Sequence, residues 1–318
     1  MAVKPPFPDE SVDGRFVRQS DAFRGWVTAR GTSDFPAEAG RYHLYVSLAC
    51  PWAHRTIIVR ALKGLDHAIG MTVVDPVRDE LGWAFRDGNG ATRDPVNGFG
   101  YLAEAYRATD PHYHGRVTVP VLWDTVSKRI VSNSDDDIMR MFEMEFDAFA
   151  KNPDLDLYPQ HRRAEIDELN ALIYETVNDG VYQAGFAATQ EAYAAAAYRV
   201  FDTLDELDAR LGKTRYLLGP GPLETDWRLF VTLLRFDPVY VGHFKCNLRR
   251  IIDYPNLSGY LRDLYQVEGV APTVDFDHIK RHYYMTHDEI NPTRIVPIGP
   301  LQDLTAPHGR EAISPSFT

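Results

Sequence analysis

The sequence is poor in cysteine, with only Cys50 and Cys246 among its 318 residues. Two cysteines exclude a framework of several disulfides, and they exclude a structural zinc site built on cysteine. Free cysteines persist in a reducing compartment, so the sequence predicts a cytoplasmic protein. No bound metal is expected.

The sequence also lacks an excess of basic charge and long apolar runs. It has 34 Lys and Arg against 45 Asp and Glu, a formal net charge of −11, and no cluster of basic residues. Binding to a phosphate backbone needs a basic surface, so nucleic acid is not expected as a partner. No window approaches the ~18 apolar residues of a transmembrane helix. The first residues, MAVKPPFPDE, lack the apolar core of a signal peptide, so no membrane partner is expected.

Length and composition predict two globular domains, because single hydrophobic cores stop growing at ~250–300 residues. Hydrophobic residues make up 44% and charged residues 25% of the chain, as in ordinary globular proteins. Residues 1–40 and 291–318 contain Pro and Gly without periodicity, which indicates an N-terminal arm and a C-terminal tail. The domain boundary is expected in the Pro-containing segment 151–159. The predicted ranges are 41–150 for an N-terminal domain and 155–290 for a C-terminal domain.

The N-terminal domain is predicted to begin with a β-α-β unit. Pro51 and Gly64 mark the two ends of its helix, and the right-handed crossover rule makes its strands parallel. A long excursion rich in Gly, Asp, Asn and Pro follows at 76–100, and such excursions are often functional. The expected elements of this domain lie, in order, at 42–47, 51–63, 71–75, 101–109, 117–124, 128–131 and 135–142.

Beyond the boundary the pattern is helical only. Apolar residues recur at helical spacing in four stretches, which predicts an antiparallel helical domain. The residues of these apolar faces are Ile166, Leu169, Ile173 and Val177, then Val200, Leu204, Leu207 and Leu211, then Trp227, Phe230 and Leu234, and finally Leu257, Leu261 and Leu264.

A lone cysteine at a strand-to-helix turn is the most specific local feature. At Cys50 the unpaired N–H groups and the positive end of the helix dipole favour thiolate over thiol. A redox dithiol motif would have cysteine at position 53, where the chain has Ala53. Cys50 is therefore predicted to be a nucleophile that forms a mixed disulfide and needs an external thiol for its release. The alternative role is a small buried hydrophobe, which is the role assigned to Cys246.

Val119-Pro120 is a second feature, because proline inside a strand pattern removes a ladder hydrogen bond. Both a cis proline that turns a backbone edge towards a ligand and a trans proline on an edge strand fit the dipeptide, and the context favours cis. A third feature is the helix start at 134–137, Ser-Asp-Asp-Asp, whose N–H groups can hold a polar ligand group. The alternative is an acidic first turn that only caps the helix.

The chain resembles a known protein family over nearly its whole length. It is similar to the glutathione transferases, and within them to the xi class, the glutathionyl-hydroquinone reductases. The stretches that carry the resemblance are CPWAHRTIIVRALKGL (50–65), GRVTVPVLWD (115–124), the helix entry before IMRMF (138–142), GVYQAGFA (180–187), DWRLF (226–230), RFDPVYVGHFKCNLRRIIDYPNLSGYLRDLY (235–265) and VDFDHIKRHYY (274–284).

This resemblance implies α/β plus all-α architecture: a thioredoxin-like N-terminal domain with the thiol site, followed by an all-helical domain that covers the acceptor site. It implies a homodimer formed through the helical domain. The implied reaction is the thiol-dependent reduction of S-conjugated hydroquinones through a mixed disulfide on Cys50, with glutathione as co-substrate and no metal.

The resemblance also assigns residues to the thiol and to the acceptor. The family pattern places Trp83, Arg116, Val119 and Pro120 around the thiol, and all four are matched here. The tyrosines that line the family's hydroquinone pocket are also matched. They are Tyr182 and Tyr283, with Tyr284 as a rival to Tyr283 and ordinary half-buried tyrosines as the alternative.

Two departures from the family pattern stand out. The usual Glu-Ser at the helix entry is Ser134-Asp135 here, and Asp135 would repel the carboxylate of a γ-glutamyl group. A hydroxyl and a carboxylate suit an ammonium or a polyol, so the thiol could instead be a sugar-bearing one such as mycothiol. The second departure is Leu223, where the family has a capping Thr. The absence of the capping Thr lowers stability by about 1 kcal/mol unless Thr225 takes over the cap.

Two other functions remain open at this stage. One is a general thioltransferase or dehydroascorbate reductase of the omega type, which has a similar cysteine. The other is a non-catalytic binding protein on the same scaffold. Retention of Cys50, Trp83, Arg116 and the two tyrosines favours an enzyme.

Overall fold

The computed structural model describes residues 10–313, which form two compact units. The first, here called the sheet unit, comprises residues 20–156 and 268–286. The second, the helical unit, comprises the described residues 10–19, 157–267 and 287–313. The chain therefore passes from one unit to the other within the Pro-containing segment in which the boundary is expected.

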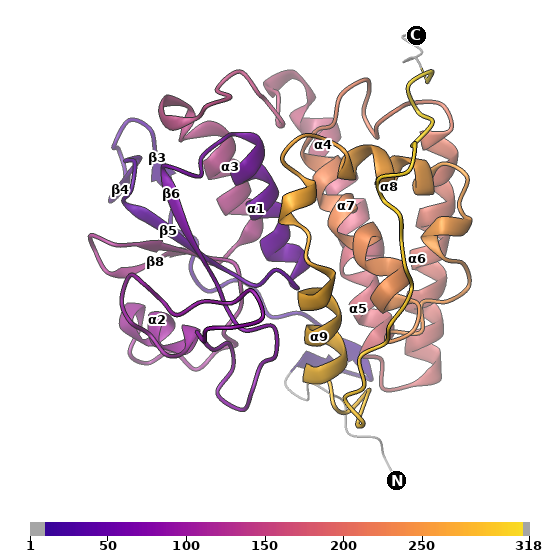
Figure 1. Cartoon of the computed structure of the whole chain (residues 1–318), viewed down its shortest axis with the longest axis horizontal. Coiled ribbons are helices and arrows are strands. Elements are labelled where there is room, and N and C mark those ends of the chain that lie inside the picture. Colours follow the sequence, from indigo (N-terminus) through magenta and orange to yellow (C-terminus); the bar gives the residue numbers. More distant parts are fainter. Residues whose placement is uncertain (1–9, 314–318) are drawn as a thin grey trace. The chain divides into compact units, whose positions relative to one another are not determined.

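A four-stranded sheet in the order β6-β5-β7-β8 is the centre of the sheet unit (Figure 1). Strand β5 (Tyr42–Val46) pairs in parallel with β6 (Ile69–Val73) and antiparallel with β7 (Val121–Asp124), which pairs antiparallel with β8 (Arg129–Ser132). All five residues of β5 are buried, as expected of a central strand covered on both faces. This mixed order is that of a thioredoxin-like domain.

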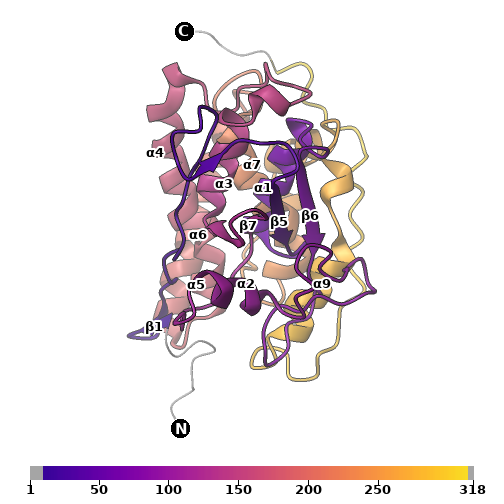
Figure 2. The same cartoon turned by 90° about the vertical axis from the view of Figure 1, so that its left-hand side faces the viewer.

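Three helices accompany this sheet. Helices α1 (Pro51–Leu62) and α3 (Asp135–Met144) pack against each other, and α2 (Leu102–Thr109) contacts β8 (Figure 2). The predicted helices and the β-α-β unit are confirmed. The predicted strand at 117–124 is too long, because only its second half pairs in the sheet.

Two segments outside the predicted domain range 41–150 also belong to the sheet unit. Residues 20–40 contain the short strands β3 (Val27–Thr28) and β4 (Phe35–Pro36), and the N–H of Gly25 donates to the carbonyl of Val131 at the edge of the sheet. Residues 268–286 contain the 3-10 turn η7 (Ala271–Thr273) and helix α9 (Phe276–Thr286). The domain ranges expected from composition thus differ from the observed units, because these segments make long-range contacts that composition does not encode.

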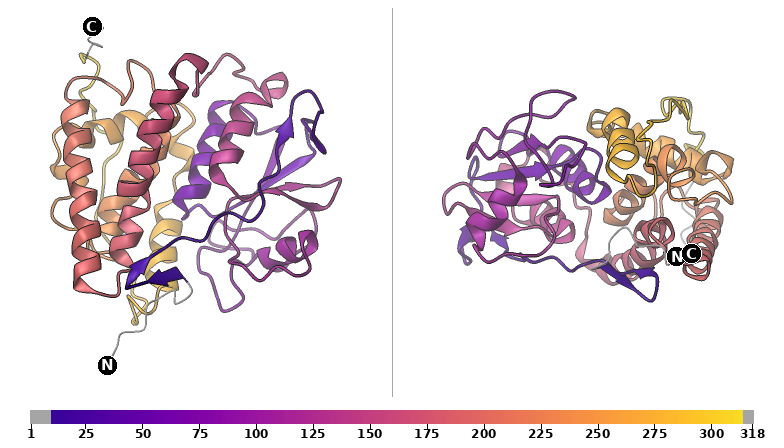
Figure 3. Two further views of the ribbon diagram at one scale, coloured as in Figure 1. Left: turned by 180° about the vertical axis from the view of Figure 1, so that it is seen from behind. Right: turned by 90° about the horizontal axis from the view of Figure 1, so that it is seen from below.

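The helical unit is built from α4 (Arg163–Ile173), α5 (Gly180–Gly185), α6 (Gln190–Leu211), α7 (Glu224–Arg235) and α8 (Leu257–Tyr265). A π-helical turn, η4 (Tyr174–Asn178), continues α4, and a second one, η5 (Phe236–Tyr240), continues α7. Figure 3 shows the helices between residues 163 and 211 running side by side. Every residue of the four predicted apolar faces is buried, which confirms those faces.

Both ends of the described chain are attached to the helical unit. A small hairpin, β1 (Ser11–Val12) with β2 (Arg15–Phe16), packs the Phe16 ring against Phe186 at 5.3 Å. The C-terminal segment runs along the unit, where the buried Arg310 donates hydrogen bonds to main-chain carbonyls that include that of Leu211 (Figure 1).

The departure at Leu223 does not move the start of α7. Leu223 remains the N-cap residue and has no side-chain capping bond, so Thr225 does not take over the cap. Instead the buried carboxylate of Asp226 accepts hydrogen bonds from the N–H of Leu223 (2.8 Å) and the N–H of Leu217 (2.9 Å). This satisfies the backbone donor of the N-cap residue and one backbone donor in the loop before the helix. In the described part of the chain no helix is long and apolar enough to cross a membrane.

Candidate active site

Cys50 occupies the N-cap position of α1, directly after the loop that leaves β5. The residue is partly exposed, and its Sγ lies 3.5 Å from the carbonyl oxygen of Val119. The peptide bond between Val119 and Pro120 is cis, as the sequence context predicts. A partly exposed cysteine at a helix N-terminus, beside the backbone edge of a cis proline, is accessible to a thiol ligand, and the positive end of the helix dipole favours its thiolate although its side chain makes no capping hydrogen bond.

The other cysteine has a different environment. Cys246 is fully buried in the helical unit, and burial raises the pKa of its thiol to about 12. The two cysteines are not joined to each other in a disulfide. The prediction that Cys246 is a core residue is confirmed.

Asn133 holds the backbone around the cis proline. Its amide donates to the hydroxyl of Thr118 (3.2 Å), and its carbonyl oxygen accepts from the N–H of Phe23 (2.8 Å). The hydroxyl of Tyr106 donates to the carbonyl of Thr118 at 2.9 Å. The segment before Val119 and the start of α3 are thereby fixed to residues 20–40.

The helix entry at Ser134-Asp135 is structured by a buried arginine. Ser134 is the N-cap residue of α3, and its hydroxyl accepts from the N–H of Asp137. Arg55, one and a half turns along α1 from Cys50, is fully buried and forms a 2.7 Å ion pair with Asp135. Its guanidinium also lies 4.6 Å from the centre of the Trp52 ring. The negative charge of Asp135 is therefore compensated by Arg55.

Asp21 brings a further carboxylate to the same helix entry. This residue is exposed as a whole, and its carboxyl group lies close to Ser134 and Asp135. Local desolvation, with the charges of Asp135 and Asp136, raises the pKa of Asp21 to about 6, against the opposing effect of Arg24. Its carboxylate would be stabilised by a cation bound at this helix entry.

Trp83 and Arg116 come from two different loops of the sheet unit. Trp83 is buried in the excursion that follows β6, where its ring stacks on that of His282 of α9 at 4.9 Å and 23°. Arg116 is half-buried, and its backbone carbonyl accepts from the hydroxyl of Tyr113 at 2.7 Å.

The two predicted pocket tyrosines belong to different units. Tyr283 lies on α9 and is buried in the sheet unit, whereas Tyr284 is half-buried. Tyr182 lies on α5 in the helical unit, and the guanidinium of Arg18 lies 4.9 Å from the centre of its ring. Asp179 fixes that guanidinium through a 2.7 Å ion pair.

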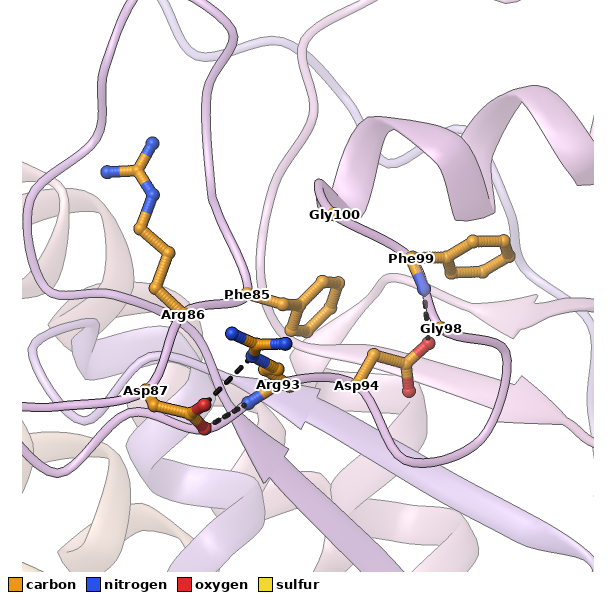
Figure 4. A pocket seen from close by; sticks show the side chains of 8 residues that line it. All are labelled: Phe85, Arg86, Asp87, Arg93, Asp94, Gly98, Phe99 and Gly100. Carbon is orange, nitrogen blue, oxygen red and sulfur yellow. Dashed lines mark hydrogen bonds and ion pairs between the residues drawn. The ribbon is translucent and has the colours of Figure 1, made fainter.

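A separate pocket of about 570 Å³ lies in the excursion, at residues 85–100 (Figure 4). Phe85 and Phe99 line it together with charged side chains that form ion pairs and hydrogen bonds with neighbouring residues of the pocket. Arg93 pairs with Asp87, and Asp94 accepts from the N–H of Phe99. None of the predicted site residues lines this pocket. The described residues contain no group of three or more His, Cys, Asp or Glu side chains arranged to hold a metal ion.

Comparison with known proteins decides the family. A family model described as glutathione S-transferase, N-terminal domain, matches residues 49–145, and one for the C-terminal domain matches residues 190–263. The chain is 54% identical over 312 residues to the glutathionyl-hydroquinone reductase YqjG of Escherichia coli, covering 96% of this chain and 95% of the relative. It belongs to the xi class of glutathione transferases. This class is that of the glutathionyl-hydroquinone reductases, and the chain is therefore an enzyme of the glutathione transferase type.

Two further matches agree with this assignment. The glutathionyl-hydroquinone reductase PcpF of Sphingobium chlorophenolicum is 50% identical over 298 residues, with 94% of each chain covered. The glutathione-bound structure of YqjG superimposes with a TM-score of 0.89 at 55% identity, covering 92% of this chain and 96% of that one. The predicted fold, a thioredoxin-like domain followed by a helical glutathione transferase domain, is confirmed.

Sequence reasoning missed four residues that contact the predicted site residues or the segments that carry them. Arg55 lies within the motif after Cys50, and an arginine on the buried face of a helix is a feature that could have identified it. For the others no local pattern exists, because their roles depend on contacts between segments far apart in the chain. These residues are Asp21, Asn133 and His282.

Proposed function

We propose that this chain is a glutathionyl-hydroquinone reductase in which Cys50 is the nucleophile. The observation that carries the proposal is the position of Cys50, a partly exposed residue at the N-terminus of α1, with its Sγ 3.5 Å from the carbonyl oxygen of Val119 and no second cysteine in its motif. The names of the relatives YqjG and PcpF support the substrate class.

The reaction needs only the conjugate and glutathione. The Cys50 thiolate attacks the sulfur of the conjugate, and the carbon–sulfur bond breaks with its electron pair on the ring carbon. That carbon takes up a proton, hydroquinone leaves, and Cys50 is held in a mixed disulfide with glutathione. A second glutathione loses its thiol proton and attacks this disulfide, so that glutathione disulfide leaves and the Cys50 thiolate returns. The hydroquinone ring is reduced, and the two glutathionyl sulfurs, one from the thioether of the conjugate and one from the thiol of glutathione, are oxidised to the disulfide.

We assign glutathione as the thiol, with recognition at the entry of α3. Asp21 supplies the carboxylate that the family pattern has at position 134, and it suits the ammonium of the γ-glutamyl group. Arg55 offsets the repulsion expected from Asp135, so the glutamyl carboxylate can approach the hydroxyl of Ser134 and the N–H groups of the helix. A sugar-bearing thiol such as mycothiol is the competing ligand that the experiment must include.

The remaining predicted residues divide between the thiol and the acceptor. Trp83, Arg116 and the backbone of Val119 contact glutathione, and Tyr182 and Tyr283 donate hydrogen bonds to the hydroquinone oxygens. The enzyme acts in the cytoplasm as a homodimer formed through the helical unit. Light scattering coupled to gel filtration tests the dimer, and a monomer at micromolar concentration would refute it.

The decisive experiment uses the glutathione and mycothiol conjugates of a simple hydroquinone, each with its matching thiol. We expect hydroquinone release from the glutathione conjugate by the wild-type protein. In Cys50→Ser we expect a loss of at least ~10³-fold, because the nucleophile is removed. Cys246→Ser is the matched control and should keep wild-type turnover, since that thiol is buried and has no part in the reaction.

The other outcomes separate the competing functions. Preference for the mycothiol conjugate would overturn the assignment of glutathione while keeping the chemistry. Turnover of simple mixed disulfides or dehydroascorbate above the conjugates would indicate a general thioltransferase. An unreactive Cys50 and no turnover of any substrate would indicate a binding protein on the same scaffold.

A further inference from the structure

Helix α9 follows the helical domain in the sequence but is bound to the excursion that carries Trp83. Three polar contacts join it to residues 76–89, and each of them involves a main-chain atom of that excursion. His282 Nδ1 lies 2.9 Å from the carbonyl oxygen of Pro76, His278 Nε2 contacts the carbonyl of Asn89, and the N–H of Arg78 donates to the hydroxyl of Thr286.

His282 occupies a central position among these contacts. It is buried, with 8% of its surface exposed. One side of its ring stacks on Trp83 at 4.9 Å and 23°, while the Tyr283 ring meets it at 5.3 Å and 72°. Trp83 is assigned to the thiol and Tyr283 to the acceptor, so His282 contacts a side chain of each assigned group.

The hydrogen bond to Pro76 fixes the orientation of the His282 ring. A carbonyl oxygen can only accept, so Nδ1 carries the proton and donates to Pro76. The plane of the imidazole is then set by the excursion as well as by α9. Because stacked rings keep their planes nearly parallel, the plane of the Trp83 indole follows that of His282.

We propose that His282 is a positioning residue that fixes Trp83 against the thiol and couples it to Tyr283. The proposal rests on the proposed function only for the identity of the two ligands. His282 acts through Trp83 and Tyr283 and donates no proton to the substrate.

Four variants test this role. His282→Ala removes both the stack and the hydrogen bond, His282→Phe keeps a stacking ring, and His282→Gln keeps a donor for Pro76. His278→Gln alters a buried residue one turn earlier on the same helix and is the matched control. We expect His282→Ala to raise KM for glutathione about tenfold, and His282→Phe about threefold, with His282→Gln close to His282→Ala. His278→Gln should leave KM unchanged even if it lowers Tm.

A double-mutant cycle with Trp83→Ala is the critical measurement. If His282 acts through Trp83, His282→Ala in the Trp83→Ala background should change KM by less than about twofold. The same tenfold effect in both backgrounds would overturn the proposal. A lower kcat at unchanged KM would also overturn it, because that result is expected when the substitution only reduces the fraction of folded protein. Glutathione affinity, measured by calorimetry without a conjugate, must follow the same cycle. This binding measurement can be made even if no hydroquinone is released. Failure of the proposed function can therefore be distinguished from failure of the proposal for His282.

Discussion

At the scale of single residues, the entry of α3 shows how one acidic group can replace another. Ser134 accepts a hydrogen bond as the N-cap residue, and Asp21 of the N-terminal segment brings its carboxyl group close to Ser134. The pair therefore offers a carboxylate where the sequence motif alone predicts its loss. The same physical argument makes thiol recognition dependent on the protonation of Asp21.

Asp21→Asn should weaken glutathione binding at neutral pH and abolish its pH dependence near pH 6. The pKa of Asp21 is raised to about 6, so the wild-type carboxylate is ionised at pH 7 and protonated at pH 5. The ratio of variant to wild-type KM should be about tenfold at pH 7 and approach one at pH 5. Kinetics between pH 5 and 8 measure this ratio. The ionisation of glutathione itself affects the variant and the wild type equally, so it cancels in the ratio.

The matched control is Asp34→Asn, an exposed acidic residue of the same segment that pairs with Arg129. Its KM should equal that of the wild type at every pH. The double variant Asp21→Asn/Ser134→Glu should regain most of the affinity at pH 7, at the expense of about 1 kcal/mol of helix capping. A KM ratio for Asp21→Asn that does not vary with pH would contradict this role.

At the scale of secondary structure elements, α1 and α3 are joined by a buried charge. Arg55 is fully buried on α1, and Asp135 in the first turn of α3 is its closest acidic partner at 2.7 Å. Asp135 itself is half-buried. Removing one member of such a pair leaves the other charge uncompensated, which is more costly than losing the pair together.

Arg55→Met should therefore lower the free energy of unfolding by about 3 kcal/mol. The double variant Arg55→Met/Asp135→Asn should recover at least 1 kcal/mol of this loss, because no uncompensated charge remains at Asp135. Urea denaturation measures both values. Arg93→Met, which breaks the exposed ion pair with Asp87, should cost less than about 0.5 kcal/mol. Equal losses in Arg55→Met and the double variant would mean that charge compensation is not what Arg55 provides.

The sequence predicted the elements better than it predicted how distant elements meet. Pro51, Gly64 and the apolar periodicities act within a few residues, so they identified α1 and the buried helix faces before any tertiary contact was known. The Cys50 turn and the cis Pro120 were predicted for the same reason. The sequence places helix α9 in the helical domain, whereas the structure places it in the sheet unit. The stack of α9 on Trp83 joins positions about 200 residues apart, and no local pattern encodes such a contact.

At the scale of the whole molecule, each compact unit contains a buried neutral histidine. His43 of β5 in the sheet unit and His243 in the helical unit both have a pKa lowered to about 4 by burial. The unfolded chain binds protons at both positions with an ordinary pKa of ~6.5. Stability is therefore lost as pH falls from 6.5 towards 4, by up to about 3 kcal/mol for each histidine.

His43→Gln and His243→Gln should each reduce this acid destabilisation. Urea denaturation at pH 7 and pH 5 gives the change in unfolding free energy, which should be about 2 kcal/mol smaller in either variant than in the wild type. His67→Gln, at an exposed position, should leave it unchanged. If the two units unfold in one cooperative transition, either substitution will reduce the pH dependence of that transition. If the units unfold separately, each substitution will reduce the pH dependence of one of two transitions. An equal effect of His67→Gln would show that burial of His43 and His243 is not the cause.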